Sequence, residues 1–150
     1  EVQAEAQRVA QVVATELDLV GVCGVEMFLL PDDTLLVNEI APRPHNSGHH
    51  TIESTVCSQF EQHVRAVCGL PLGSTALISP AVMVNILGDG SGNQLAGVAD
   101  MLSIPNAHFH LYGKREAKAG RKMGHLTVLA DDVETALERA LGARQLLSWK

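Results

Sequence analysis

The most restrictive feature of the sequence is a pair of apolar segments, each with one glutamate, joined by a four-residue turn. Residues 19–30 read LVGVCGVEMFLL, residues 31–34 read PDDT and residues 35–40 read LLVNEI. Proline and aspartate favour a turn, and the flanking runs of valine, leucine and isoleucine favour strands. The three segments together predict a β-hairpin.

Pairing outward from this turn places Met27 opposite Asn38 and Glu26 opposite Glu39. Opposed side chains in an antiparallel pair have Cβ atoms about 4.5–5.5 Å apart, and like charges there destabilise the sheet. A shared proton would relieve the repulsion. A bound Mg²⁺ would also relieve it, because one or two carboxylates hold this ion while phosphate oxygens and water complete its shell. A register slipped by one residue would instead turn a glutamate to solvent.

A dense polar segment, NEIAPRPHNSGHH, occupies residues 38–50. The prolines on either side of Arg43 restrict the backbone, and its guanidinium matches carboxylate, bicarbonate and phosphate geometry. His45 can donate a hydrogen bond or serve in acid–base chemistry near neutral pH. His49 and His50 are interpreted as supporting loop residues. A zinc site built from the three histidines is the weaker alternative, because no acid or cysteine lies at a recognised ligand spacing.

A second cluster of charge lies in GKREAKAGRKMGH, residues 113–125. Five of the eleven lysines and arginines fall within residues 114–122, although the net charge of the chain is −6. The glycines in this segment allow its backbone to turn and to approach a ligand closely. The segment is interpreted as a phosphate clamp, and the alternative is a solvated hairpin tip.

Helices and further strands surround these clusters. Apolar spacing predicts a helix over residues 1–19. Ser58 and Glu61 form a capping box for a second helix that ends near Gly69. The remaining expected elements are strands at 80–87, 107–113 and 125–130, a loop at 88–93, and a helix from Asp131 with Glu134 to about Leu147.

Each of the two later helices has a stripe of side chains along one face, and we expect the stripe of the earlier helix to be buried. The stripes comprise Phe60, Val64 and Val67 in one helix and Val133, Leu137, Leu141 and Arg144 in the other. The fold class is α+β, with antiparallel strands and helices packed on them. The connector at residues 69–80 divides the chain into residues 1–72 and 73–150.

Composition limits the possible functions. The chain has 150 residues, 46% of them hydrophobic, and no apolar run approaches the length of a membrane span. The negative charge argues against nucleic-acid binding over the whole surface. The N-terminus shows no targeting segment. Three cysteines without a CxxC spacing predict free buried thiols in a reducing cytoplasm.

The motifs GVEMF, NEIAPRPHNSGH and HLYGK…GRKMGHLTV resemble one family over almost the whole chain. They are similar to the C-terminal part of the 5-(carboxyamino)imidazole ribonucleotide synthases. These are ATP-grasp enzymes of purine biosynthesis, also called the ATPase subunit of phosphoribosylaminoimidazole carboxylase. The resemblance implies the C-terminal half of an ATP-grasp domain followed by a small β-rich domain.

The resemblance also implies roles for the acid pair. Glu26 and Glu39 match the acids that hold Mg²⁺ (or Mn²⁺) on the phosphates of ATP, the co-substrate. Asn38 and Glu39 match the pair that contacts ATP. The implied partners are ATP, bicarbonate and 5-aminoimidazole ribonucleotide, with a homodimer in the full-length protein and neither nucleic acid nor membrane.

Two further groups of residues receive roles in the same way. Arg43 and His45 match residues placed where bicarbonate and carboxyphosphate react, with Asn46 nearby. Lys114 and Arg121 match the clamp on the 5′-phosphate of the ribonucleotide. The implied reaction forms carboxyphosphate from ATP and bicarbonate and passes its carboxyl group to the exocyclic amine of the nucleotide.

Two alternatives stand beside this reading. One is another ATP-grasp ligase, such as a formate-dependent glycinamide ribonucleotide transformylase, against which the APRPHNSGH loop argues. The other is a non-catalytic metal- or anion-binding module. The helix at residue 1 has no capping residue before it, which indicates a cut inside a larger domain. We therefore expect this segment alone to be inactive.

Overall fold

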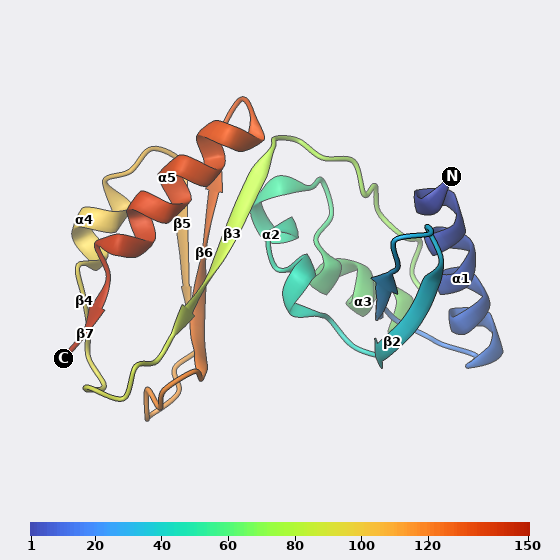
Figure 1. Cartoon of the computed structure of the whole chain (residues 1–150), viewed down its shortest axis with the longest axis horizontal. Helices are drawn as coiled ribbons and strands as arrows, with labels where there is room; N and C mark the ends of the chain where they lie inside the picture. The colour runs from blue at the N-terminus through green and yellow to red at the C-terminus, as the bar shows by residue number, and fades with distance from the viewer. The chain divides into compact units, whose positions relative to one another are not determined.

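The computed structural model describes residues 1–150, and their contacts divide them into two units (Figure 1). The first unit is Glu1–Ile52 with Val56–Thr75, and the second is Glu53–Thr55 with Ala76–Lys150. Mixed helices and antiparallel strands confirm the α+β class.

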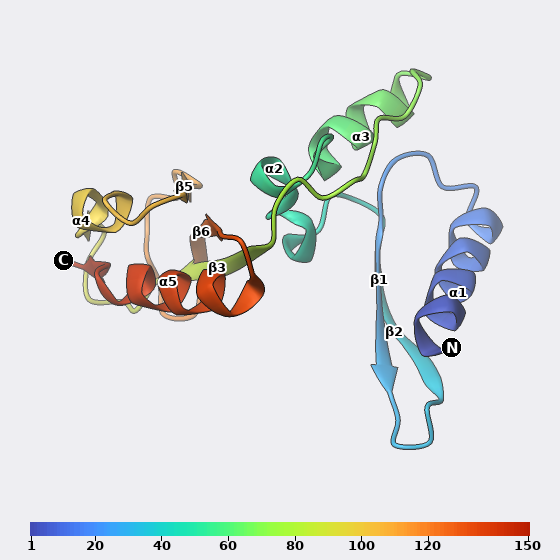
Figure 2. The ribbon, with the colours of Figure 1, turned by 90° about the horizontal axis from the view of Figure 1, so that it is seen from above.

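The first unit contains the expected hairpin with a helix beside it. Its elements are α1 (Val2–Glu16), β1 (Gly24–Leu29), β2 (Leu35–Ala41), the 3-10 turn η1 (Asn46–Gly48) and α3 (Gln59–Val67). The short helix α2 (Thr51–Ser54) is divided, because Glu53 and Ser54 belong to the second unit. Figure 2 shows α1 running alongside the β1–β2 hairpin. Neither η1 nor α2 was expected from the sequence, because both are too short to carry a helical period.

The turn of the hairpin is one residue longer than predicted. Leu29, not Leu30, pairs with Leu35. The Leu30 N–H donates to the Thr34 carbonyl at 2.9 Å, so Leu30 belongs to the turn. Asp33 adopts a left-handed conformation with φ of 64°, which aspartate tolerates better than most residues.

A bulge in β2 compensates for the longer turn. Met27 pairs with Val37, so the predicted pairing of Met27 with Asn38 is wrong. Asn38 is the extra residue, and beyond it the register returns so that Glu26 lies opposite Glu39. The predicted opposition of the two acids is therefore confirmed, although one extra residue in the turn and one in the strand produce it.

The segment between α1 and β1 is not a strand, in contrast to the prediction. The helix ends at Glu16, and Asp18 turns the chain with φ of 46°. Gly21 has φ of 125°, a conformation outside the strand region that glycine can adopt. The Val22 N–H donates to His63 Nδ1 at 3.2 Å and has no strand partner. The first strand therefore begins at Gly24.

The predicted capping of α3 is confirmed, whereas the predicted burial of its apolar stripe is wrong. The Ser58 hydroxyl accepts the Glu61 N–H at 3.2 Å, and Gly69 follows the helix with φ of 65°. Phe60, Val64 and Val67 are exposed. The buried residue is Gln62, whose amide bonds both the N–H and the C=O of Gly73.

The second unit is a small sheet with one long helix on it. Its elements are β3 (Ala81–Leu87), β4 (Leu95–Ala96), α4 (Val98–Leu102), β5 (Ala107–Leu111), β6 (Lys122–Leu129), α5 (Val133–Gln145) and β7 (Ser148–Trp149). The strands β3, β6 and β5 form an antiparallel sheet in that order, and β4 pairs with β7. Figure 1 shows α5 lying along the sheet, with the core between them.

The face of α5 that meets the sheet consists of alanines. Ala136, Ala140 and Ala143 are fully buried, whereas Val133, Leu137 and Leu141 of the predicted stripe are exposed. Small side chains allow the helix to approach the strands closely. The cap is also one residue later than predicted, because Asp132 accepts the Thr135 N–H at 2.7 Å.

The three cysteines differ in burial. Cys57 is buried, Cys23 is half-buried and Cys68 is exposed, and none of the three forms a disulfide. The expectation of burial therefore holds for Cys57 and is wrong for Cys68. None of the helices combines the length and the apolar character that crossing a membrane requires.

Enlarging the alanine face should destabilise the second unit. Ala140→Leu inserts three heavy atoms between α5 and the sheet where no side-chain surface is exposed. We expect a loss of about 1–3 kcal/mol in the free energy of unfolding, measured by urea denaturation. Leu141→Ala is the control, since this side chain is exposed and its loss should change stability by less than about 0.5 kcal/mol. Equal effects of the two substitutions would contradict the assigned packing face.

Candidate active site

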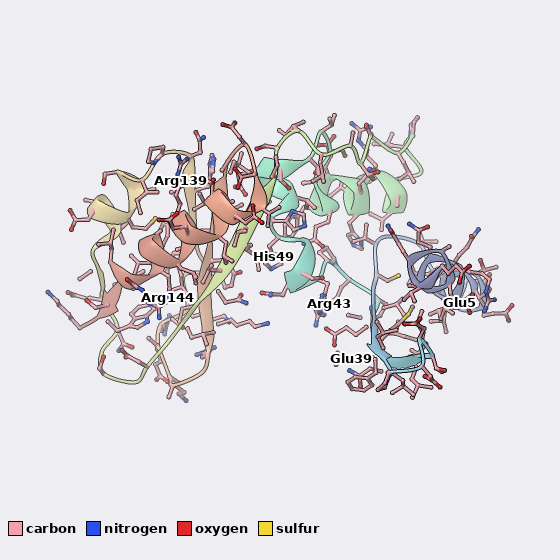
Figure 3. All side chains as sticks on the ribbon, turned by 45° about the horizontal axis from the view of Figure 1, so that its top comes forward. Glu5, Glu39, Arg43, His49, Arg139 and Arg144 are labelled. Atoms are coloured by element: carbon pink, nitrogen blue, oxygen red, sulfur yellow. The ribbon has the colours of Figure 1, made fainter.

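The acid pair lies on a solvent-exposed part of the hairpin. Glu26 on β1 and Glu39 on β2 are both exposed and occupy directly opposed positions. Figure 3 labels Glu39 at the end of β2 and Arg43 on the segment that leaves this strand. The exposed carboxylates are accessible to a ligand that carries positive charge.

His45 connects the loop to the acid pair. Its Nε2 lies 3.3 Å from Glu26 Oε1. Its Nδ1 accepts the Ser47 N–H at 3.4 Å and lies 2.9 Å from the Ser47 hydroxyl. Since Nδ1 is an acceptor, Nε2 carries the proton of the neutral ring and faces the Glu26 carboxylate. His45 therefore offsets part of the repulsion that Glu39 exerts on Glu26.

Gln59 fixes the backbone of His45 from both sides. Its Oε1 accepts the His45 N–H at 2.9 Å, and its Nε2 donates to the His45 carbonyl at 2.8 Å. The same Nε2 lies 2.8 Å from His49 Nδ1. Gly48 leaves room for this amide, because a Cβ there would lie 2.6 Å from Gln59 Oε1. The loop is thus held by a side chain outside the polar segment.

Sequence reasoning missed Gln59, which follows the capping serine of α3. A glutamine at the first helical position gives no signal of a partner fourteen residues earlier. Thr51 adds support, because its hydroxyl accepts the Gln59 N–H at 3.0 Å and donates to the Gly48 carbonyl. The His49 ring packs on Phe60 with centroids 5.3 Å apart. His49 therefore has contacts that suit the supporting role expected for it.

Arg43 is exposed and pairs with no acidic side chain. Its Nη1 donates to the Pro44 carbonyl at 3.2 Å, and its N–H donates to the Ala41 carbonyl at 2.8 Å. Asn46 begins η1 and is half-buried, and Asn38 is exposed at the bulge. The remaining guanidinium donors are available to an anion.

The second cluster lies in the β5–β6 connection of the second unit. The Lys114 ammonium donates to the carbonyl of Lys122, the residue next to Arg121, and lies 5.6 Å from the centre of the Tyr112 ring. Arg121 Nη1 donates weakly to the Glu116 carbonyl at 3.4 Å. The structure therefore places Lys114 next to the backbone at Arg121, at the base of the loop.

The tip of this loop packs against the β3–β4 connection. Ala117 is buried, its N–H donates to Asn93 Oδ1 at 2.9 Å, and its carbonyl accepts the Gly90 N–H at 3.0 Å. Gly88 permits this approach, because a Cβ there would lie 2.5 Å from Ala117 backbone atoms. The basic segment is thus more ordered than a solvated hairpin tip would require.

The acid pair suits a hard cation whose remaining ligands come from a bound phosphate group and from water. No group of three or more histidine, cysteine, aspartate or glutamate side chains in the chain could hold a metal ion. Two exposed, opposed carboxylates match the share that a protein supplies to Mg²⁺ bound with a phosphate ligand. The polar loop does not form the zinc site considered as the alternative.

Comparison with known proteins places these features in a family. Residues 1–60 match the ATP-grasp domain, and residues 81–139 match the phosphoribosylaminoimidazole carboxylase C-terminal domain. N5-carboxyaminoimidazole ribonucleotide synthase of Bacillus subtilis is 53% identical over 128 residues, which are 85% of this chain and 33% of that protein. The chain belongs to this family. The resemblance seen in the sequence motifs is thereby confirmed.

Solved structures of the family have the same fold. The synthetase from Thermotoga maritima matches with a TM-score of 0.89 and 53% identity over 97% of this chain and 41% of its own. The Aspergillus clavatus synthase in complex with ADP and 5-aminoimidazole ribonucleotide has a TM-score of 0.75 and 46% identity over 84% of this chain and 34% of its own. The chain spans about a third of the length of the curated relatives it matches.

Removing the Gln59 amide should loosen the His45 loop. In Gln59→Ala the His45 N–H and carbonyl lose their partners, and we expect a loss of about 1–3 kcal/mol in the free energy of unfolding. Hydrogen exchange at the His45 amide should accelerate in parallel. Gln7→Ala, at an exposed site on α1, is the control and should change neither quantity measurably. Unaltered hydrogen exchange at the His45 amide in Gln59→Ala would refute the role of Gln59 in holding the His45 backbone.

Proposed function

We propose that this chain is part of an ATP- and bicarbonate-dependent carbon–nitrogen ligase that carboxylates the exocyclic amine of 5-aminoimidazole ribonucleotide. The observation that carries the proposal is the opposed acid pair contacted by His45, because it links a cation site to an anion-binding loop within one unit. Family membership and the ADP and ribonucleotide complex of the Aspergillus relative support it. Residues 1–72 are assigned to the ATP-grasp part and residues 73–150 to the C-terminal domain.

The first unit serves the ATP half of the reaction in this proposal. Glu26 and Glu39 hold Mg²⁺ or Mn²⁺, and Asn38 contributes with Glu39 to ATP binding. The cation, when bound, neutralises charge on the phosphates of ATP. The exposure of both acids leaves room for a phosphate chain, which is larger than the ion itself.

Arg43, His45 and Asn46 serve the bicarbonate half. The free guanidinium donors of Arg43 hold bicarbonate in a bidentate contact, which aligns its oxygen for attack on the γ-phosphate. His45 Nε2, close to Glu26 Oε1, orients this carboxylate toward the loop. Attack on the γ-phosphate forms carboxyphosphate at this loop and releases ADP. The amine then takes the carboxyl group and gives up a proton, and phosphate leaves.

The second unit serves the nucleotide substrate. Lys114 and Arg121 bind its 5′-phosphate, because two cations at the base of one loop supply donors and charge for an anion. A homodimer of the full-length protein and a location in the cytoplasm complete the proposal. The defining test is ATP hydrolysis by the full-length protein: it should require both bicarbonate and 5-aminoimidazole ribonucleotide, and hydrolysis independent of either would reject the function.

Neutralising Glu39 should abolish turnover of the metal–ATP complex. Glu39→Gln keeps the shape of the side chain and removes one of the two charges that hold the cation. We expect kcat of the full-length protein to fall by about 100-fold or more, as measured by coupled ADP release. Glu16→Gln, at the exposed end of α1, is the matched control and should retain full activity. Near-normal turnover in Glu39→Gln would remove this acid from the metal site.

Removing the Lys114 ammonium should weaken nucleotide-substrate binding without affecting ATP. A charged hydrogen bond contributes about 1.5–3 kcal/mol, so Lys114→Ala should raise KM for 5-aminoimidazole ribonucleotide about 10- to 100-fold. Lys118→Ala is the control, because Lys118 is exposed and pairs with Glu116 at 3.2 Å. If KM for the ribonucleotide stayed the same in Lys114→Ala, the clamp assignment would be wrong.

A further inference from the structure

A row of polar side chains in the second unit leads to Lys114. Glu53 Oε1 lies 2.6 Å from His110 Nε2, and the His110 ring stacks on His125 with centroids 4.5 Å apart and an interplanar angle of 14°. His125 Nδ1 lies 2.8 Å from the Tyr112 hydroxyl, and the Tyr112 ring lies 5.6 Å from the Lys114 ammonium. These five residues form a continuous chain of contacts.

Strand geometry explains why the row forms. His110 lies on β5 and Tyr112 directly follows the strand, so these residues, two apart in extended chain, have side chains on the same side. His125 is the direct partner of His110 on β6. Phe109, the neighbour of His110, points to the other face and packs on the core that contains Ala140 and Ala143. The row therefore occupies the face of the sheet opposite the helix.

Burial makes this row costly as a purely structural device. The Glu53 side chain is 8% exposed and its Oε2 has no hydrogen-bond partner, while His125 is 2% exposed. A buried carboxylate and stacked imidazoles stabilise a sheet less reliably than apolar side chains of similar volume. Apolar cross-strand pairs would hold β5 to β6 at lower cost. The row therefore calls for a role beyond holding the strands together.

Lys114, at the loop end of the row, is the residue whose ammonium needs a fixed position. A lysine has a flexible four-carbon stem, and ordering it costs up to about 2 kcal/mol in rotamer entropy. The ring of Tyr112 attracts the ammonium, and the Lys122 carbonyl accepts a hydrogen bond from it. Burial raises the pKa of the Tyr112 phenol, which keeps its proton and lies within hydrogen-bond distance of His125 Nδ1.

We propose that Tyr112, anchored through His125 and His110 to Glu53, is a positioning residue that holds the Lys114 ammonium ready for a phosphate group. The inference rests on the proposed function only in identifying that phosphate as the 5′-phosphate of the nucleotide substrate. Tyr112 acts through Lys114 and does not itself contact the reacting atoms.

Kinetics of the full-length protein test the positioning role. A cation–π contact contributes about 0.5–2 kcal/mol, so Tyr112→Leu should raise KM for 5-aminoimidazole ribonucleotide about 2- to 30-fold and leave KM for ATP unchanged. Tyr112→Phe keeps the ring but loses the anchor, and Glu53→Gln weakens the far end of the row, so both should give smaller increases. His108→Gln is the matched control, because His108 lies on the same face of β5 outside the row.

A double variant separates positioning from a general structural effect. In the Lys114→Ala variant Tyr112 has no ammonium to hold. Adding Tyr112→Leu to this variant should therefore leave its KM for the ribonucleotide unchanged. The inference would be overturned if the KM increase of the double variant equalled the product of the increases of the two single variants. It would also be overturned if Tyr112→Leu raised KM for ATP as much as KM for the ribonucleotide. Tyr112→Phe guards against misfolding, because it preserves the packing of the ring.

Inorganic phosphate provides a readout independent of the reaction. Its binding is followed by the amide shifts of Gly113 and Gly120, and both Lys114→Ala and Tyr112→Leu should weaken it. Normal phosphate affinity in Tyr112→Leu would overturn the positioning role. If the unmodified protein hydrolysed ATP without need of the ribonucleotide, the proposed function would fail, while the phosphate titration would still decide the inference.

Discussion

Backbone pairing between β1 and β2 brings the like charges of Glu26 and Glu39 to opposed positions, and the site in the first unit is organised around this repulsion. The two acids do not hold the hairpin together, so its register depends on the main chain and on the apolar pairs near the turn. The His45 ring, with Nε2 at 3.3 Å from Glu26 Oε1, offsets part of this repulsion. Because Gln59 holds the His45 backbone, this compensation is present before any cation binds.

The opposition of the acids could be predicted from the sequence, but its structural origin could not. Counting from a four-residue turn gives the right partner for Glu26 because the turn gains Leu30 while the strand gains Asn38. The two shifts cancel only beyond the bulge, so Met27 has a different partner from the one predicted. A bulge has no strong sequence signature, since any residue that tolerates the local backbone can provide it.

The positions of the helices could be predicted from capping residues and apolar spacing, whereas their buried faces could not. Ser58 and Gly69 mark the ends of α3 locally, within a few residues of each end. Burial instead depends on elements distant in sequence, which is why the alanines of α5 meet the sheet and its leucines remain exposed. Gln59 and Glu53 were missed for the same reason: their partners lie fourteen and fifty-seven residues away. An apolar stripe shows that a face can be covered, but not what covers it.

The two clusters proposed to bind anions are supported in different ways, because the side chains of Arg43 and Lys114 differ in stiffness. The guanidinium of Arg43 is a rigid planar fork, so fixing the backbone near it is sufficient to aim it. Prolines on both sides and the amide clamp on His45 provide that support. The ammonium of Lys114 sits on a flexible stem, and a fixed backbone would leave its position undefined. A ring beside the ammonium and a carbonyl acceptor are therefore needed, and the buried row from Glu53 to Tyr112 supplies the ring at a defined place.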